Sequence, residues 1–268
     1  MLSSSLTVYI VCQNLEYFFL YSFLGWLMET VLCSVRERKF IDRGFLAGPV
    51  CPIYGVGMLL LIFCLSPLKA HPLLLFFGGI LCASALEYFT SWCMEKLFHA
   101  KWWDYQDKKC NLHGRICLSI SIAWGVLTVV FFEWIHPVIA SLLSSVPYSV
   151  AIPIITVLSV IFLADLVQSV IAASQLSQTL KLLEKADKIK LELDTMSLRS
   201  RQTLQKKLDE LKERLETQKC NLLQKRLIHA YPQLKSIHGK KVLKDLRNIC
   251  QRKKSSHNQD ETHQLSKS

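Results

Sequence analysis

The sequence predicts an all-α, polytopic membrane helical bundle followed by a helical tail in the cytoplasm. Hydrophobic residues make up 51% of the 268-residue chain and the mean hydropathy is +0.26, but both values average two unlike parts. Residues 1–175 hold ten basic and ten acidic residues, whereas residues 176–268 hold 22 and 11 and carry the whole formal charge of +11. We therefore expect a transmembrane domain over residues 1–175 and a water-soluble region after it.

Five long apolar segments in the first domain predict about five transmembrane helices. A bilayer core about 30 Å thick needs about 20 apolar residues per helix, and each segment has roughly that length. The predicted spans lie near residues 15–35, 45–67, 72–95, 115–136 and 150–174.

The charges of the connecting loops predict which side of the membrane each loop faces. Four basic residues follow the first span and four follow the third, whereas the loop after the second span has only Lys69 and the loop after the fourth has none. Cytoplasmic loops carry the excess of Lys and Arg, so the first and third loops are assigned to the cytoplasm. The N-terminus is then outside and the C-terminus inside a cell membrane that the chain crosses several times.

The region after residue 175 has the pattern of a long helix and a coiled coil. It lacks glycine and proline up to residue 231, and five of its leucines follow the 4-3-4-7 spacing of an a/d seam. We expect a helical, coiled-coil tail over residues 176–250 and a disordered end over residues 251–268. The seam leucines are Leu204, Leu208, Leu211, Leu215 and Leu222.

The basic tail has several possible partners. It either folds back on itself or forms a homodimer through the coiled coil, or it docks a soluble protein. Its positive charge begins where the last apolar segment ends, so the anionic headgroups of the lipid bilayer are the nearest partner. Nucleic acid is not an expected partner, because aromatic residues do not interleave the basic ones and no known binding motif is present.

Three acidic residues inside predicted spans, Glu29, Glu87 and Asp165, share one depth. Each lies about 10–15 Å from the predicted cytoplasmic boundary at 1.5 Å per residue. Spans one, three and five run inwards, so these carboxylates lie near the negative ends of their helices and need compensating cations. Arg43 and Arg115 begin spans two and four, and we expect them to face the acids. The five residues form either a substrate- or ion-binding site or ion pairs that lock the helices together.

The start of the second span predicts a break in the helix. Gly48, Pro49 and Pro52 come just before Tyr54, and two prolines so close together remove backbone donors and kink or break a helix. Irregular backbone at membrane depth is tolerated only against protein or a water-filled cavity. We therefore expect this kinked segment to line the polar site, as broken helices do in transporters.

Several ordered motifs between residues 15 and 135 resemble those of one known family. The chain is similar to the family named Putative ABC-transporter type IV, the CmpB-like multi-pass membrane proteins found mainly in Firmicutes. The tail is not part of this resemblance. The motifs are GW..E at Gly25, Trp26 and Glu29, RGFL.GP..PIYG at residues 43–55, LEY at residues 86–88, WDY at Trp103, Asp104 and Tyr105, N..GR at Asn111, Gly114 and Arg115, and WG at Trp124 and Gly125.

This resemblance implies a membrane permease that works with a separate ATPase subunit. The family pattern most often has a serine where this chain has Gln106, and a proline where it has Lys109-Cys110. The resemblance therefore singles out Trp103, Asp104, Tyr105 and Asn111 as a loop motif without fixing a role for it.

The sequence does not predict an enzyme. No GxxxxGK[ST] motif occurs, so any ATP hydrolysis belongs to a separate subunit. His99 and Asp104 match the HxxxxD spacing of acyltransferases, but this pattern is short and arises easily by chance. The ten cysteines have no CxxC pair and no HExxH occurs, so we expect neither a metal site nor any other cofactor.

Two functions remain open at this point. The first is the membrane permease component of a transporter, with the polar site in the cytoplasmic half of the membrane. The second is a membrane-anchored scaffold or sensor that acts through its cytoplasmic coiled coil.

Overall fold

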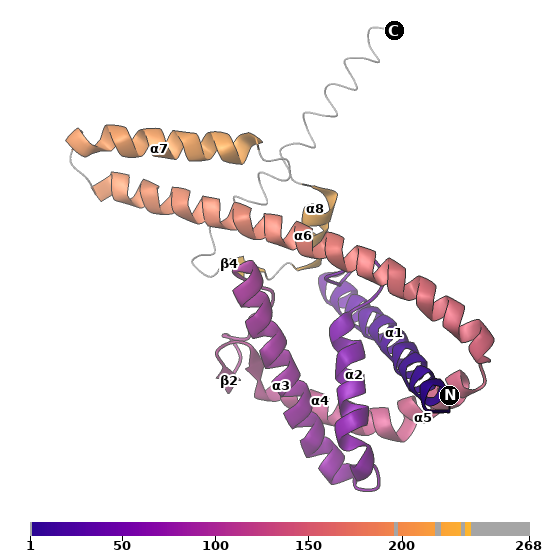
Figure 1. Ribbon diagram of the computed structural model, residues 1–268. Coiled ribbons are helices and arrows are strands. Elements are labelled where there is room, and N and C mark those ends of the chain that lie inside the picture. The colour runs from indigo at the N-terminus through magenta and orange to yellow at the C-terminus, as the bar shows by residue number, and fades with distance from the viewer. Residues whose placement is uncertain (1, 196–197, 218–220, 232–233, 237–268) are drawn as a thin grey trace. The chain divides into compact units, whose positions relative to one another are not determined.

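The computed structural model describes residues 2–195, 198–217, 221–231 and 234–236 (Figure 1). Most of these residues are helical, so the predicted all-α class is confirmed for the described part of the chain. The α-helices are α1 (Leu2–Glu37), α2 (Pro52–Leu65), α3 (Pro72–Phe98), α4 (Leu118–Val130), α5 (His136–Ser144), α6 (Tyr148–Thr195), α7 (Leu198–Thr217) and α8 (Leu222–Ala230). There is also one short 3-10 helix, η1 (Ser66–Leu68), and one short π-helix, η2 (Phe131–Ile135), in the described residues. The two-residue strands are β1 (Ala100–Lys101), β2 (Asn111–Leu112), β3 (Ile116–Cys117) and β4 (Lys235–Ser236).

The described residues divide into two compact units. The first unit consists of Met1–Cys93 together with Asp104–Ser169, and it contains all three acids of the predicted site. The second consists of Met94–Trp103 and the described residues from Val170 onwards. Because α6 runs from Tyr148 to Thr195 without a break, one helix contributes to both units.

Four helical stretches of the described chain are long and apolar enough to cross a membrane. They are Thr7–Glu37, Pro72–Phe98, Leu118–Ser144 and Tyr148–Leu193. The third continues through the π-helix η2 into α5, so it extends past the predicted end near residue 136. Many of their large apolar side chains are exposed, as a lipid environment requires and water does not favour.

The second predicted span, near residues 45–67, is not one full-length helix. Residues 38–51 have no helix or strand, and α2 begins only at Pro52 and has 14 residues. At 1.5 Å per residue, α2 is about 21 Å long, which is less than the roughly 30 Å of a bilayer core. The physical reason is the one expected from the prolines: Pro52 is tolerated as the first residue of a helix but not inside it.

Small residues let the helices of the first unit pack closely. A Cβ atom on Gly25 of α1 would lie 2.2 Å from Cγ of Tyr54, so the tyrosine ring rests directly on the α1 backbone. A Cβ atom on Gly55 would lie 2.3 Å from Oγ of Ser22, and one on Gly79 of α3 would lie 2.2 Å from Oγ1 of Thr128 on α4. Substitution at these glycines therefore separates α2 from α1 or α4 from α3.

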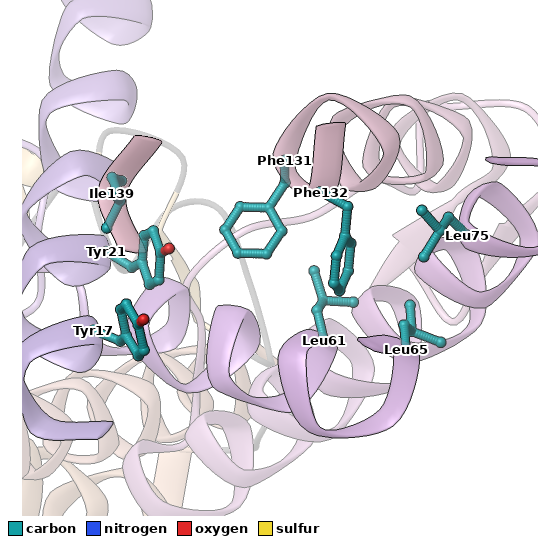
Figure 2. Packing of buried hydrophobic residues seen from close by; sticks show 8 residues of the cluster. All are labelled: Tyr17, Tyr21, Leu61, Leu65, Leu75, Phe131, Phe132 and Ile139. Atoms are coloured by element: carbon teal, nitrogen blue, oxygen red, sulfur yellow. The ribbon is translucent and has the colours of Figure 1, made fainter. Parts of the chain in front are cut away.

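An apolar cluster fills the part of the first unit away from the acids. Figure 2 shows its side chains, which come from α1, α2, α3, the π-helix η2 and α5. Tyr21 donates or accepts a 2.8 Å hydrogen bond with Nδ1 of His136, so a polar contact lies at the edge of the cluster. The members are Tyr17, Tyr21, Leu61, Leu65, Leu75, Phe131, Phe132 and Ile139.

The second unit contains the described part of the tail. Leu208 and Leu215 of the predicted seam are buried, whereas Leu222 is 80% exposed and does not continue the seam. Strand β1 pairs with β4, and Nε2 of Gln224 donates to Oε1 of Gln175 at 3.2 Å. The coiled coil stays a prediction, and the predicted disordered end over residues 251–268 lies outside the described residues.

Candidate intramembrane polar site

The residues after α1 turn back along that helix. We name residues 38–51 the return segment. It is held by side chains and one carbonyl at regular four-residue intervals on α1, which satisfy three of its backbone amides against protein. The contacts join the Ile41 amide to Ser34 Oγ at 3.0 Å, the Arg43 amide to Thr30 Oγ1 at 3.2 Å, Trp26 Nε1 to Asp42 Oδ1 at 2.9 Å and the Cys51 amide to the Ser22 carbonyl at 2.9 Å.

This path places a cation opposite the first acid. Nε of Arg43 donates to Oε2 of Glu29 at 3.1 Å, and the two side chains are 15% and 30% exposed. The other oxygen of Glu29 accepts from the hydroxyl of Tyr54 at 2.7 Å. The ring of Tyr54 reaches it by crossing over Gly25. Glu29 therefore has one charged and one neutral partner.

Glu87 of α3 has different partners. Its Oε1 accepts from the hydroxyl of Tyr105 at 3.0 Å and its Oε2 accepts from Nε1 of Trp124 at 3.2 Å. The residue is only 8% exposed. Both donors are uncharged, so within the described part of the chain this buried carboxylate is stabilised by hydrogen bonds alone. The rings of Tyr54 and Trp124 lie 5.9 Å apart between centroids, which connects the surroundings of Glu87 to those of Glu29.

Tyr105 lies outside the membrane-spanning helices, in the loop before β2. Burial raises the pKa of its phenol, and the nearby charge of Glu87 and the more distant charge of Glu29 act in the same direction. The phenol therefore stays protonated near neutral pH and acts as a hydrogen-bond donor to Glu87.

The loop motif fixes the backbone of Tyr105. The Tyr105 amide donates to the Gly114 carbonyl at 2.8 Å, and the Gly114 amide donates to Oδ1 of Asn111 at 3.0 Å. Nδ2 of Asn111 donates in turn to the Lys108 carbonyl at 2.8 Å. Gly114 has φ +69°, and a Cβ atom there would lie 2.5 Å from Oδ1 of Asp104, so both conformation and space favour glycine.

The third acid, Asp165 of α6, is held by the return segment. Its Oδ1 accepts from the Ala47 amide at 2.9 Å and its Oδ2 accepts from the Gly48 amide at 2.7 Å. The hydroxyl of Ser169, one turn later on α6, donates to Oδ1 at 3.1 Å. All three donors are uncharged, so Asp165 is anchored by hydrogen bonds and joins α6 to the return segment.

Arg115 lies beside the residue that follows Glu87. One of its terminal nitrogens donates to the hydroxyl of Tyr88 at 3.1 Å, and its guanidinium carbon lies 5.2 Å from the centre of the Tyr88 ring. The same hydroxyl lies 3.1 Å from Nδ1 of His113. The expected pairing of a cation with Glu29 is thus present at Arg43, whereas Arg115 is placed against an aromatic ring.

Contacts link Glu29 to Glu87 through Tyr54 and Trp124, whereas Asp165 is held separately by the return segment, and we name these acids and their partners in the first unit the polar site. It consists of Glu29, Arg43, Tyr54, Glu87, Tyr105, Trp124 and Asp165, with the amides of Ala47 and Gly48. Pro49 and Pro52 shape the return segment and the start of α2, as their positions predicted. Trp103 belongs to the second unit.

Sequence reasoning missed the role of Trp124. It was quoted only as part of a motif, and a tryptophan in an apolar helix gives no sign that its indole N–H faces a carboxylate. Tyr105 was singled out as a loop residue without its partner Glu87. Within the described chain, no group of three or more His, Cys, Asp or Glu residues is placed to hold a metal ion.

Comparison with known proteins agrees with the motifs. The model of one family, described as Putative ABC-transporter type IV, matches residues 16–170. This match extends beyond the residues 15–135 that the motifs indicated and includes Asp165, so every residue of the polar site lies within it. No curated protein and no solved structure matches the chain. The chain is thus a transporter-related, multi-pass membrane protein, and it belongs to the Putative ABC-transporter type IV family.

Proposed function

We propose that the chain is the membrane permease component of a transporter and that the polar site binds the transported solute or a coupling ion. The observation that carries this proposal is the environment of Glu87. A buried acid that served only to lock helices would be expected to pair with a base, as Glu29 does with Arg43. Glu87 is more deeply buried, and the donors that hold it in the described part of the chain are uncharged, which is costly for packing but suits an acid that binds a positive partner.

The other predicted residues have distinct parts in this proposal. Arg43 and Tyr54 hold Glu29 beside the site, and Asp165 fixes the return segment to α6. Arg115 and Tyr88 support the loop that carries Tyr105. Solute contact is therefore assigned first to Glu87.

We propose five membrane crossings, of which the return segment and α2 together make the second. The Cys51 amide bonds to the Ser22 carbonyl, so α2 begins about 22 Å back along α1 from its end at Glu37. α2 then adds about 21 Å in the same direction, since Tyr54 lies on Gly25 and Gly55 lies on Ser22. Together these lengths exceed a bilayer core. Five crossings keep the N-terminus outside and both basic loops in the cytoplasm.

Two partners follow from this proposal. The chain has no ATP-binding motif, so a separate ATPase subunit supplies the energy. Five crossings around one site are few for a complete pathway, so we propose a homodimer through the tail, where Leu222 is 80% exposed in a single copy.

The test combines partner identification with one substitution. The full-length protein is purified from native membranes in mild detergent, and any co-purifying ATPase is identified and its turnover measured. We expect Glu87→Gln to retain the ATPase but lower its turnover at least about ten-fold, because the carboxylate is removed without a change in shape. Glu133→Gln is the control, since Glu133 is an exposed acid in the same apolar stretch as Trp124.

Two results would contradict the permease proposal. One is the absence of any ATPase from the purified protein. The other is an equal turnover in the Glu87→Gln and Glu133→Gln proteins.

One observation favours the scaffold or sensor as a second candidate. α6 enters both units as a single helix, so movement in the membrane can be passed directly to the tail. In that case removal of residues 176–268 abolishes the cellular phenotype, whereas Glu87→Gln leaves it unchanged. A permease gives the opposite order of effects.

A further inference from the structure

The two glutamates of the polar site differ in what neutralises them. Glu29 has the guanidinium of Arg43 at 3.1 Å, whereas the partners of Glu87 among the described residues are the hydroxyl of Tyr105 and the indole of Trp124. A charge in a site of low polarity is costly without a counter-charge, and a negative charge on Glu29 disfavours a second one nearby. Two carboxyl groups in such unequal surroundings are the pattern expected of acids that have separate roles.

The two oxygens of Glu87 are not equivalent. The indole N–H of Trp124 can only donate, so Oε2 has to remain an acceptor. The hydroxyl of Tyr105 can donate or accept. When a proton binds to Oε1, the Tyr105 hydroxyl keeps its own hydrogen, turns it away and accepts the new O–H. One proton enters, one hydrogen bond reverses and no other bond changes.

Tyr105 also connects Glu87 to the loop side of the site. Glu87 is 8% exposed, whereas Tyr105 is half-buried in its loop. The Tyr105 amide donates a hydrogen bond to the Gly114 carbonyl, and the Tyr105 carbonyl accepts one from the Lys108 amide. The raised pKa of the phenol keeps its proton in place, so the hydroxyl can turn without becoming charged. The titratable groups that face Glu87 from the packed elements are Tyr105 from the loop, Tyr54 from α2 and Glu29 from α1, the last with Arg43 as its partner.

We propose that Glu87 is a reversible proton-binding site that takes its proton at Oε1, where the hydroxyl of Tyr105 changes from donor to acceptor of the shared hydrogen bond. This inference deepens the proposed function and rests on it for its biological meaning, because it names the proton as the ion that the transporter site takes. The geometry that supports it is the pair of donors on Glu87. The indole of Trp124 can only donate a hydrogen bond, whereas the hydroxyl of Tyr105 can donate or accept one.

The test uses the full-length protein in phosphatidylcholine vesicles and dicyclohexylcarbodiimide as the probe. This apolar reagent modifies protonated carboxyl groups and spares carboxylates. Mass spectrometry of the modified peptides is compared from about pH 5 to about pH 9. We expect modification of Glu87 that falls at least about ten-fold over this range, and less modification of Glu29, whose Oε2 is occupied by the guanidinium of Arg43.

Two tyrosine variants test the part played by Tyr105. Tyr105→Phe removes a donor to the carboxylate, so modification of Glu87 should persist to a pH about one unit higher. Tyr148→Phe is the matched control, because Tyr148 is exposed at the start of α6 and its ring contacts Tyr9, and it should leave the profile unchanged. Infrared difference spectra across the same pH range give a second measurement: a protonated-carboxyl band in the wild type that is missing from Glu87→Gln.

The proposal is overturned if Glu87 is neither modified nor seen as a protonated carboxyl at the lowest pH, or if the Tyr105→Phe and Tyr148→Phe profiles coincide. Neither the modification of Glu87 nor the infrared spectrum requires an ATPase. Modification of Glu87 in a protein that has no ATPase partner would overturn the permease and leave the proton site standing. Loss of ATPase turnover in the Glu87→Gln protein, without any modification of Glu87 in the wild type, would support the permease and overturn the proton site.

Discussion

Glu29 and Glu87 are the same residue type at similar predicted depth, yet the chain treats them in opposite ways. Glu29 lies next to the return segment, which delivers Arg43 to it, and it is 30% exposed. Glu87 is almost fully buried and receives only the neutral hydrogens of Tyr105 and Trp124. The contrast teaches that shared depth does not mean shared role: one acid has the surroundings of a structural ion pair, and the other those of a group that binds a positive ligand or a proton.

The largest effect is expected when the cation of the pair is removed. Arg43→Met leaves the Glu29 carboxylate without its counter-charge, and we expect the free energy of unfolding in detergent to fall by about 2–3 kcal/mol. This value is below that of a fully buried pair because both side chains are partly exposed. Lys39→Met, an exposed position in the same segment, should change it by less than about 0.5 kcal/mol. Equal losses would remove the basis for calling Glu29 structural.

A smaller effect is expected at the neutral partners of Glu87. Trp124→Phe keeps an aromatic ring but removes one donor, so the free energy of unfolding should fall by about 1 kcal/mol. Trp134→Phe is the control, because Trp134 is 65% exposed on the same apolar stretch. Chemical unfolding of the two variants under the same conditions checks the difference. A loss as large as that of Arg43→Met would mean that Glu87 too depends on its partners for packing.

The sequence predicted the features of this site that depend on how far along a helix each residue lies. Residue spacing from the loop charges placed Glu29, Glu87 and Asp165 at one depth, and the prolines predicted that the second span would be broken. Glu29 and Arg43 were expected to meet, and they do. These predictions need only the rise of a helix and the cost of a buried charge.

The rest depended on side-chain direction, which a single sequence does not reveal. Arg115 was expected to face the acids, which stays a prediction, and its contact with Tyr88, the residue after Glu87, could not be read from the sequence. The return of residues 38–51 along α1 depends on hydrogen bonds to Ser34 and Thr30, two residues that look like ordinary helix positions. Hydropathy alone also marked the second span as full length, because apolar composition is the same whether or not the backbone is helical.

The most direct test of the account compares Glu29→Gln with Glu87→Gln in the same preparation. We expect Glu29→Gln to lower the free energy of unfolding by about 2–3 kcal/mol, because Arg43 loses its counter-charge. Glu87→Gln should change it by less than about 1 kcal/mol, since a lone buried charge and one hydrogen bond are lost together, yet it should abolish turnover of the associated ATPase. The account is contradicted if Glu87→Gln destabilises the protein as much as Glu29→Gln does while turnover is retained.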